Sequence, residues 1–404
     1  MEGSRAMPER IDGVIVAGAG PVGLVSALKL ARAGIRVVVL DAEPGIIQAP
    51  RAVVYHSPVV EALDRMGLLE DLREIGVLKQ DYWWWTIDGT LIARIDMAVL
   101  ARDTRYPFNL HLGQNNLARI VLRHLLRVPG VELRWGHGIT GLRQDDDGVT
   151  VTVETEGGET ELRADWLIGA DGGRSGVRRA LGLPLDGVTW PEWFVATDIR
   201  YDMEAHGYGT ANLVIDPDHW AIMPKIDQTG LFRCTYREHP GLPEEEVRRL
   251  VPERQAMILP GRAPVEPVAV SPYRVHDRCV PGFRAGRVLL AGDAAHLVNP
   301  IGGLGLTGGL LDAIPLGDAL AAVIAGRAEE AVLDDWAEER RRVFLEVVSP
   351  AAKENRRRMS ERDPARREED FARLRRMAED PEVARQGLGQ VFNVVGRHPL
   401  AQPA

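Results

Sequence analysis

A glycine-rich turn near the N-terminus constrains the fold of this chain more than any other feature. The run Gly18-Ala19-Gly20-Pro21-Val22-Gly23 stands between the apolar segment 13–17 and the helical pattern 21–33, and a second apolar segment, 35–40, is followed by Asp41. In a βαβ unit, one glycine allows the tight turn, the next lets the backbone approach a pyrophosphate, and the third lets helix and strand pack closely. The pyrophosphate then lies over free N–H groups of the helix, and Asp41 accepts hydrogen bonds from a ribose. The sequence therefore predicts a dinucleotide-binding unit.

A second glycine cluster follows the apolar segment 166–170. It reads Gly169-Ala170-Asp171-Gly172-Gly173-Arg174-Ser175-Gly176. An ionised Asp171 at such a turn is able to accept hydrogen bonds from ribitol or ribose hydroxyls, and Arg174 and Arg178 are able to face phosphates. Taken alone, an Asp-Gly turn that caps the helical segment 177–181 explains the cluster better.

A third cluster follows the apolar segment 288–291. It begins with Gly292-Asp293 and continues through Asn299-Pro300-Ile301-Gly302-Gly303-Leu304-Gly305-Leu306-Thr307-Gly308 into a helical pattern that reaches about residue 325. A glycine-lined turn that opens a long helix lets a flat ring approach the backbone, and it directs the positive end of the helix at that ring. A loop with an aspartate cap is an equally good reading of this cluster by itself.

Together, the three clusters resemble the signature of the single-component FAD-dependent aromatic hydroxylases, the para-hydroxybenzoate hydroxylase-like family. The resemblance extends from about Val14 to about Val323. In that family the Asp-Gly segment, here Asp171-Gly172, serves both FAD and the nicotinamide cofactor, and the Gly-Asp segment, here Gly292-Asp293, binds the ribityl chain. The resemblance therefore implies FAD as the cofactor and NADPH or NADH as the electron donor.

Further positions match the family one by one. Arg51 resembles its arginine beside the FAD pyrophosphate, and Gln114 resembles its FAD-contacting glutamine. Pro300 and the turn at Gly302-Gly303, followed by Gly305, resemble the segment that lies against the isoalloxazine. Leu306 and Thr307 would donate backbone N–H groups to the pyrimidine edge of the flavin. The family usually has asparagine where this chain has Thr307.

The resemblance implies a monooxygenase that hydroxylates a phenolic or polyketide-like aromatic substrate with O₂ through a C4a-hydroperoxyflavin. The protein would place the ring, exclude water and stabilise developing charge. Alternatives on the same fold are an FAD-dependent epoxidase, a reductase or a drug-inactivating monooxygenase. A non-catalytic FAD-binding protein is an alternative of a different class.

Four residues are expected to line the substrate pocket ahead of Pro224, by a loose match to the family: Thr210, Asn212, Trp220 and Ile222. Since none of the four is an arginine, a small aromatic acid is disfavoured as the substrate.

The residue that takes the phenolic proton is not named by the sequence. His111, His219 and Tyr236 stand on expected strands of the substrate region, where each residue type is more often structural than basic in function. The triplet Trp83-Trp84-Trp85 alternates between the two faces of a strand, which favours packing over ligand binding.

The predicted fold class is α/β, a Rossmann-like FAD-binding domain with an interleaved β-sheet substrate domain and a C-terminal helical segment. The FAD-binding domain is expected in three parts, 11–80, 111–184 and 276–328, and the substrate domain in two, 81–110 and 185–275. Residues 329–404 are charged and helical, with breaks expected at Pro350, Pro364 and Pro381. This segment is a candidate homodimer contact.

Composition excludes several classes of function. With 49 basic and 58 acidic side chains, the chain carries a formal charge of −9 and is not expected to bind nucleic acid. Its apolar windows are strand-sized, so no membrane segment is expected, and a cytoplasmic location is the default. Its two cysteines, Cys234 and Cys279, have no metal-ligand spacing, and no metal is predicted.

Overall fold

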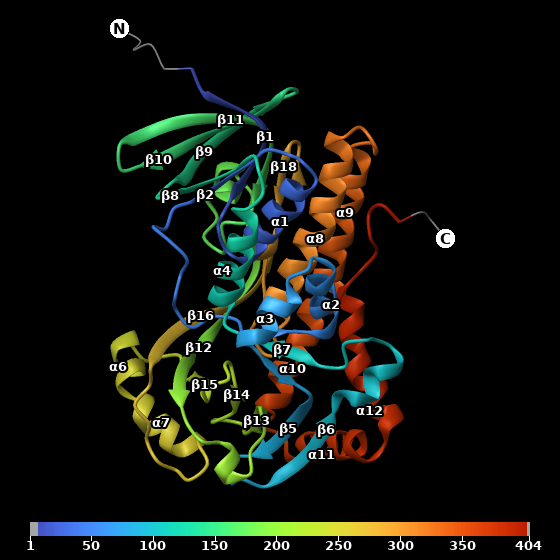
Figure 1. Cartoon of the computed structure of the whole chain (residues 1–404). Helices are drawn as coiled ribbons and strands as arrows, with labels where there is room; N and C mark the ends of the chain where they lie inside the picture. The colour runs from blue at the N-terminus through green and yellow to red at the C-terminus, as the bar shows by residue number, and fades with distance from the viewer. Residues whose placement is uncertain (1–6, 402–404) are drawn as a thin grey trace.

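A computed structural model describes residues 7–401. It is elongated, with one β-sheet at each end and a small sheet between them (Figure 1). The chain passes between the two ends several times, as the sequence predicts, so neither large sheet is built from one continuous segment. The predicted fold class is confirmed.

The sheet at the N-terminal end has a parallel centre. Strand β1 (Glu9–Ala17) pairs in parallel with β2 (Val37–Asp41) and β11 (Gly158–Gly169), which in turn pair in parallel with β8 (Val131–Trp135) and β18 (Val288–Leu290). The edge strands β17 (Arg284–Ala285), β9 (Gly138–Asp145) and β10 (Gly148–Thr155) add antiparallel pairs. Val14, Ile15, Val38 and Leu167 are fully buried, as is typical of the central strands of a parallel sheet.

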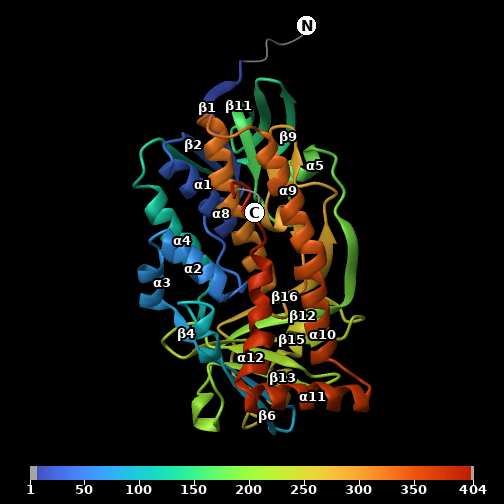
Figure 2. The same ribbon diagram turned by 90° about the vertical axis from the view of Figure 1, so that its right-hand side faces the viewer.

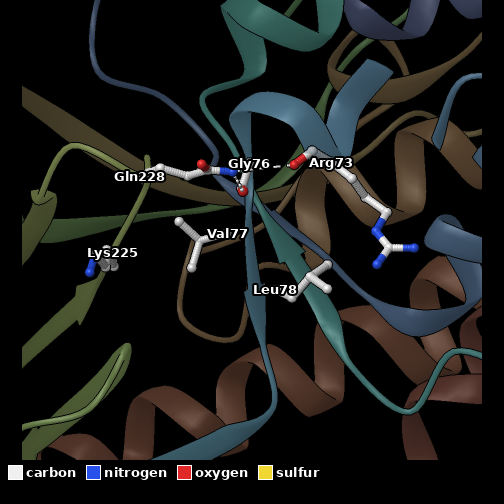
Figure 3. Close-up of a pocket in the computed structure, with 6 residues that line it drawn as sticks. All are labelled: Arg73, Gly76, Val77, Leu78, Lys225 and Gln228. Carbon is white, nitrogen blue, oxygen red and sulfur yellow. Dashed lines mark hydrogen bonds between the residues drawn. The ribbon is translucent and has the colours of Figure 1, made fainter. Parts of the chain in front are cut away.

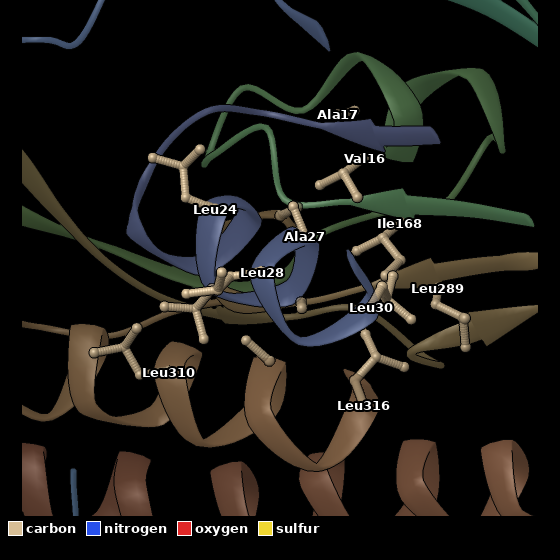
Figure 4. Close-up of a cluster of buried hydrophobic side chains, with 14 of the residues drawn as sticks. Val16, Ala17, Leu24, Ala27, Leu28, Leu30, Ile168, Leu289, Leu310 and Leu316 are labelled. Carbon is tan, nitrogen blue, oxygen red and sulfur yellow. The ribbon is translucent and has the colours of Figure 1, made fainter. Parts of the chain in front are cut away.

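Two helices dominate the core of this sheet. Helix α1 (Pro21–Arg32) packs between the strands and α8 (Leu304–Ile324), and α4 (Gln114–Leu125) lies beside it. Figure 4 shows Leu28 of α1 next to Leu310 of α8, with Val16 and Ile168 on the strands beside α1. Helix α8 is long and apolar enough to cross a membrane, but 78% of its most apolar window is buried inside this fold. It is a core helix.

The sheet at the opposite end has the order β19-β16-β12-β15-β14-β13-β5-β6. Its strands are β5 (Asp81–Thr86), β6 (Leu91–Asp96), β12 (Asp186–Arg200), β13 (Ala211–Ile215), β14 (Ala221–Pro224), β15 (Leu231–Glu238), β16 (Ala269–Cys279) and β19 (His296–Leu297). Most of its neighbours are antiparallel, but β5 pairs in parallel with β13, which joins two segments far apart in sequence.

The two faces of this sheet have different neighbours. Val195, Val214 and Tyr236 pack with α6 (Glu244–Arg249) and α7 (Val251–Ile258) on what we call the outer face. Phe194 and Trp220 pack with Ile301 on the other side, which we call the inner face because it looks toward the third glycine cluster. Side chains alternate between these faces, so Trp83 and Trp85 stack on each other at 5.9 Å, while Trp84 joins the inner cluster. The predicted alternation of the tryptophans is confirmed.

A three-stranded antiparallel sheet lies between the two large ones. In it β7 (Asn109–His111) is central, with β3 (Val54–Tyr55) and β4 (Val77–Lys79) on either side. The sequence pattern over residues 57–76 predicts a single helix between β3 and β4, but the structure has two, α2 (Ser57–Arg65) and α3 (Leu69–Ile75). Gly67 separates them because its φ of +65° is the left-handed conformation that ends a helix.

The C-terminal helices run along one side of the molecule (Figure 2). They are α9 (Ala331–Val343), α10 (Ser349–Met359), α11 (Pro364–Glu379) and α12 (Pro381–Gly389). Pro364 and Pro381 each begin a helix, as expected, whereas the break expected at Pro350 is wrong. A π-helical turn, Phe344–Val348, connects α9 directly to α10, and its wider turn accommodates the ring and missing N–H of the proline.

A buried carboxylate ties the C-terminal helices to the core. Asp312 of α8 accepts hydrogen bonds from Arg340 Nε of α9 at 2.8 Å, His296 Nε2 at 2.7 Å and the Gly292 N–H at 3.1 Å. Burial alone would raise the pKa of Asp312, but the His296 and Arg340 partners lower it to about 2. The third glycine cluster is therefore held by a charged network, since Gly292 begins that cluster.

We predict that Asp312→Asn destabilises the protein by about 3–5 kcal/mol at pH 7, because Arg340 is left as a buried, unpaired charge. The folded pKa of Asp312 lies below its unfolded value of about 3.9, so its contribution is present above that pH and is lost as pH falls toward 2. Between pH 7 and pH 2 the variant should therefore lose about 2 kcal/mol less stability than the wild type. Urea midpoints from pH 7 downward measure both effects. Asp318→Asn is the control. Asp318 lies on α8 like Asp312, but it is partly exposed and pairs with Lys29 of α1, so its replacement should lower the free energy of unfolding by less than about 1 kcal/mol.

Candidate functional site

The three glycine clusters meet at the carboxyl ends of β1, β11 and β18. A Cβ atom added to Gly18 would lie 2.3 Å from the carbonyl oxygen of Ala170, so the first and second clusters are in backbone contact. One added to Gly292 would lie 2.9 Å from Cγ2 of Val22, which brings the third cluster against the first. Ligands of parallel α/β sheets bind at this edge of the sheet. The structure thus makes one site of three motifs far apart in sequence.

The glycines of the first cluster have the spatial roles that a dinucleotide requires. Gly18 has φ +102°, and an added Cβ at Gly23 would lie 1.9 Å from the Gly18 carbonyl oxygen, so neither position has room for a side chain. Gly20, by contrast, has an extended φ of −76° and no atom within 4 Å of an added Cβ. Open space directly at the N-terminus of α1, with Pro21 at its first position, fits a pyrophosphate.

The two aspartates at the ends of β2 and β11, Asp41 and Asp171, differ in how many of their oxygen atoms are hydrogen-bonded. Asp41 accepts hydrogen bonds from the Ala19 N–H at 2.6 Å and the Glu43 N–H at 2.9 Å and remains partly exposed. Asp171 Oδ2 accepts from Gly176 N–H at 2.7 Å and Val177 N–H at 3.1 Å, at the start of α5 (Gly176–Ala180), which is the capping role expected for it alone.

The second oxygen of Asp171 is different. Asp171 Oδ1 is buried and has no hydrogen-bond partner within residues 7–401, and burial raises the pKa of this carboxyl. An unsatisfied buried acceptor is costly, and a ligand hydroxyl would satisfy it. Arg178, which the sequence placed near phosphates, instead donates to the carbonyls of Ala294 at 3.2 Å and Gly173 at 2.9 Å, and so links the second cluster to the third. Arg174 is exposed.

The third cluster presents backbone donors and a carboxylate to the same space. Gly303 is the N-cap of α8 in the left-handed conformation, with φ +68°, so the N–H groups of Leu304, Gly305 and Leu306 have no acceptor within the helix. The hydroxyl of Thr307 is buried and donates to the Gly303 carbonyl at 2.9 Å. Asp293 is exposed and makes no side-chain hydrogen bond within the described part of the chain. Free amides at a helix start, beside a free carboxylate, suit the flavin pyrimidine edge and ribityl hydroxyls.

The loop before α8 is held from several sides. His56 Nε2 lies 2.7 Å from the carbonyl oxygen of Gly302, and Asn299 Oδ1 accepts from the Ile301 N–H at 3.1 Å. Pro300 is half-buried at the start of this loop. Asn299 Nδ2 is buried without a partner among the described residues, a second orphaned polar group at this site. The loop is therefore rigid enough to position a ring placed against it.

Arg51 and Gln114 lie at the junction with the substrate sheet. The Gln114 N–H donates to the Ala52 carbonyl at 3.1 Å, so the two predicted positions are neighbours. The Arg51 side chain is exposed, while its carbonyl accepts from the guanidinium of Arg233. Arg233 is itself paired with Asp198 at 2.7 Å, in a nearly buried ion pair on the inner face.

The four predicted substrate residues do not lie together. Trp220 is buried edge-to-face against Phe194, and Ile222 packs in the same inner cluster, beside Ile301 of the flavin loop. Thr210 is half-buried at the start of β13, and its carbonyl accepts from the Lys225 N–H at 2.8 Å.

Asn212 is bonded entirely within the sheet. Its side chain is fully buried, accepts from the Gly209 N–H and Trp85 Nε1, and donates to the Gly209 carbonyl. These contacts place it on the outer face with Trp85, because neighbouring residues of β13 alternate. Trp220 and Ile222 thus stay predicted pocket residues on the inner face, whereas Asn212 lies on the opposite face of the sheet.

The three candidates for the general base are also separated. Tyr236 packs in the outer cluster, and His219 lies in the turn before β14, where its N–H donates to Asp216. His111 is buried on β7, with Nδ1 3.1 Å from the Lys225 carbonyl, and burial lowers its pKa to about 3. Burial thus favours the neutral form of His111. Three further buried polar residues lie near it that the sequence did not single out: His56, Lys79 and Asn109. Their only sequence signal is a polar residue within a short apolar segment.

A separate open pocket of about 370 Å³ lies outside this site (Figure 3). Its lining residues are Arg73, Gly76, Val77, Leu78, Lys225 and Gln228. The Gln228 amide donates to the carbonyls of Arg73, Glu74 and Gly76, which fastens the loop after β14 to the small central sheet. None of the predicted cofactor or substrate residues lines this pocket.

Comparison with known proteins agrees with this geometry. A family model described as an FAD binding domain matches residues 12–351. The para-nitrophenol 4-monooxygenase of Pseudomonas sp. (strain WBC-3) is 49% identical over 392 residues, 96% of this chain and 97% of the relative. The 6-hydroxy-3-succinoylpyridine 3-monooxygenase of Pseudomonas putida is 41% identical over 89% of this chain and 91% of the relative. The crystal structure of a p-nitrophenol 4-monooxygenase from Pseudomonas putida DLL-E4 superposes with a TM-score of 0.94 at 48% identity, over 96% of this chain and 99% of that one.

We predict that Gly20→Val lowers the flavin content of the purified protein more than tenfold. The extended backbone at Gly20 accepts valine, but the side chain would occupy the open space at the start of α1. The unfolding temperature of the flavin-free protein should stay within about 2 °C of the wild type, because the change is not strained. Gly389→Val, also in open space but in α12, is the matched control and should keep its flavin. A fully yellow Gly20→Val protein would contradict the assignment.

Proposed function

The chain belongs to the FAD-dependent aromatic hydroxylases, and we propose that it acts on a single-ring phenol with an electron-withdrawing substituent para to the hydroxyl group. The observation that carries this proposal is 49% and 41% identity, over nearly the whole chain, to two monooxygenases named for single-ring substrates. By contrast, a relative named for a tetracycline precursor, 6-methylpretetramide 4-monooxygenase, is 35% identical, and the match covers only 60% of its length.

The names of these two relatives share a pattern. In para-nitrophenol and in 6-hydroxy-3-succinoylpyridine, the hydroxyl group stands para to a nitro or an acyl group. The named positions of attack, carbon 4 and carbon 3, are the carbons that carry those groups. We infer that the enzyme directs oxygen to the ring carbon para to the hydroxyl, at the site of the substituent.

The inner face of the substrate sheet supports an aromatic substrate without a carboxylate group. Trp220, Phe194 and Ile222 offer apolar and aromatic surface beside the flavin loop. The buried guanidinium on this face, Arg233, is already neutralised by Asp198, so it is not available to a substrate carboxylate. This agrees with the expectation from sequence that a small aromatic acid is disfavoured.

FAD, when bound, supplies electron transfer to O₂ and the activated oxygen that is inserted. The residues proposed to hold it are the three glycine clusters with Asp41, Arg51, Gln114, Asp171 and Asp293. The free amides at the start of α8 would stabilise negative charge on the adjacent ring edge. The inner face would orient the phenol and exclude water, so that the activated oxygen reacts with the ring.

The reaction balances without a further reactant. Oxygen bonds to the substituted carbon, the hydroxyl group of the phenol becomes a carbonyl, and the substituent leaves with the electron pair of its bond. For para-nitrophenol, NAD(P)H and O₂, the products are para-benzoquinone, nitrite, NAD(P)⁺ and water. We propose NADPH or NADH as the reductant because the Asp171-Gly172 segment is present in the form that the resemblance associates with the nicotinamide cofactor.

Two further proposals concern the location of the protein and its assembly. We propose a cytoplasmic enzyme. The burial of α8, the one helix within residues 7–401 that is long and apolar enough to cross a membrane, supports this location, and the cytoplasm supplies reduced nicotinamide. We propose the charged helices α9–α12 as the surface for a homodimer.

We predict that para-nitrophenol accelerates anaerobic bleaching of the bound flavin by NADPH or NADH at least tenfold. With O₂, one nitrite should form for each NAD(P)H consumed. meta-Nitrophenol, with hydrogen at the attacked carbon, should release none. Rapid-mixing absorbance and a colorimetric nitrite assay measure these quantities. Flavin that NAD(P)H cannot reduce would contradict self-contained turnover, and turnover without nitrite would contradict attack at the substituted carbon.

A further inference from the structure

One face of the small central sheet is unusually polar for its burial. Lys79 on β4 is directly opposite Asn109 on β7, and residues two apart on a strand share a face, so His111 lies on it as well. Val54 on β3 pairs with His111. His56 follows Val54 by two residues and therefore continues the same face just beyond β3. The exposures are 0% for Lys79, 1% for Asn109, 2% for His111 and 6% for His56. We call these four residues the basic face.

Lys79 has no acidic partner. Its Nζ lies 3.3 Å from Met97 Sδ and over the ring of Tyr82, and no carboxylate within residues 7–401 comes within salt-bridge distance of it. The nearest acid to influence it, Asp81, is paired with Arg94 at 2.8 Å. Burying a charged lysine destabilises the fold unless a negatively charged group lies beside it.

The other groups facing Lys79 do not provide that charge. Burial lowers the pKa of Lys79 well below its usual value, and burial likewise lowers the pKa of His56 to about 4 and of His111 to about 3. Burial raises the pKa of Tyr82 to about 12, and its hydroxyl accepts from Asn109 Nδ2 at 3.0 Å. With no ligand, burial therefore favours the uncharged forms of Lys79, His56 and His111 alike.

The basic face borders the site proposed for flavin and substrate. His56 Nε2 contacts the Gly302 carbonyl in the flavin loop, and an added Cβ at Gly303 would lie 3.4 Å from the same nitrogen. Tyr82 stands on the same face of β5 as Trp84, which is the inner face of the substrate sheet. Asn109 Oδ1 is buried and unpaired among the described residues, so the cluster still has an unused acceptor.

We propose that Lys79 takes up the proton of the phenol when substrate binds, so that the substrate is held as phenolate beside a newly charged ammonium group. This rests on the proposed function. The phenolic O–H bond breaks, an N–H bond forms at Lys79, and the pair remains neutral overall. Lys79 therefore acts directly on the substrate, first as the base and then as the counter-ion, and the phenolate it stabilises is the more electron-rich ring at the para carbon.

Lys79, rather than a histidine, is the acceptor for two reasons. An amine is intrinsically more basic than an imidazole by several pKa units, and both are depressed here by burial. The Tyr82 ring beneath Nζ attracts a cation, whereas no ring is stacked on His56 or His111 in the described structure. Uptake of the proton inside the protein also means that none is released to solvent.

The first experiment uses the wild-type holoenzyme and para-nitrophenol at a pH below the pKa of the free phenol, in weak buffer. We expect the bound ligand to show the visible absorption of phenolate while a pH indicator detects less than about 0.2 proton released per ligand bound. Release of one proton per phenolate would overturn the proposal. Nitrobenzene, which has no hydroxyl, should bind with no proton change in either case.

The second experiment compares Lys79→Met with the wild type. Methionine has a similar volume and removes a buried amine, so folding is expected to be retained, as flavin content and circular dichroism would show. We expect para-nitrophenol to bind the variant at least tenfold more weakly at that pH, or to bind as the neutral phenol. Lys225→Met is the control and should match the wild type, because Lys225 is only partly exposed but, unlike Lys79, has an acidic partner, the exposed Glu204. Phenolate binding by Lys79→Met with wild-type affinity would overturn the proposal.

A third outcome separates the two levels of inference. If para-nitrophenol neither perturbs the flavin spectrum of the wild type nor speeds its reduction, the proposed function fails and this inference fails with it. If it does both and the proton is nevertheless released to solvent, only the role of Lys79 is rejected.

Discussion

Backbone contact between the first two glycine clusters is the constraint on which this structure depends. The turn at Gly18 touches the carbonyl of Ala170, and Gly23 touches Gly18, at distances that exclude any side chain. Because these contacts close the ends of β1 and β11 against each other, they also determine where α1 begins. Val22 then packs against Gly292, so the third cluster is placed by the same turn. The cofactor site is therefore formed by the turns at the carboxyl ends of β1, β11 and β18. The loops that start at this edge connect it to the substrate sheet.

The sequence predicted the parts of the structure that are governed by local stereochemistry. Apolar segments without alternation form the buried parallel strands. The glycine clusters form the turns at the carboxyl ends of those strands. The alternation of the three tryptophans followed from strand geometry alone. Interleaving of the domains could also be predicted, since βαβ patterns recur at both ends of the first 330 residues with β-rich segments between them.

Features set by long-range contact were not accessible in that way. Two local features were missed as well: the predicted helix 57–76 divides at Gly67, which takes the left-handed conformation, and Pro350 continues a helix because a π turn precedes it. Asn212 turned to the outer face because pairing with β5 fixed the register of β13. The basic face is the clearest case. Lys79, Asn109 and His56 stand in three separate segments, and only the antiparallel pairing of β3, β7 and β4 brings them together.

The parallel pairing of β5 with β13 has a consequence for how this chain acquires its structure. The strands of the substrate sheet come from residues 81–96, 186–279 and 296–297, so the sheet cannot close until nearly three quarters of the chain has been synthesised. Until β13 (Ala211–Ile215) has been made, β5, with its three tryptophans, has only β6 as a neighbour and leaves an apolar edge exposed. Long-range strand pairing is slow to form because the loop entropy is lost before the contacts are gained. Assembly of this sheet is therefore the step at which a nascent chain is most prone to aggregate, and the step at which chaperones would have the most effect on its yield.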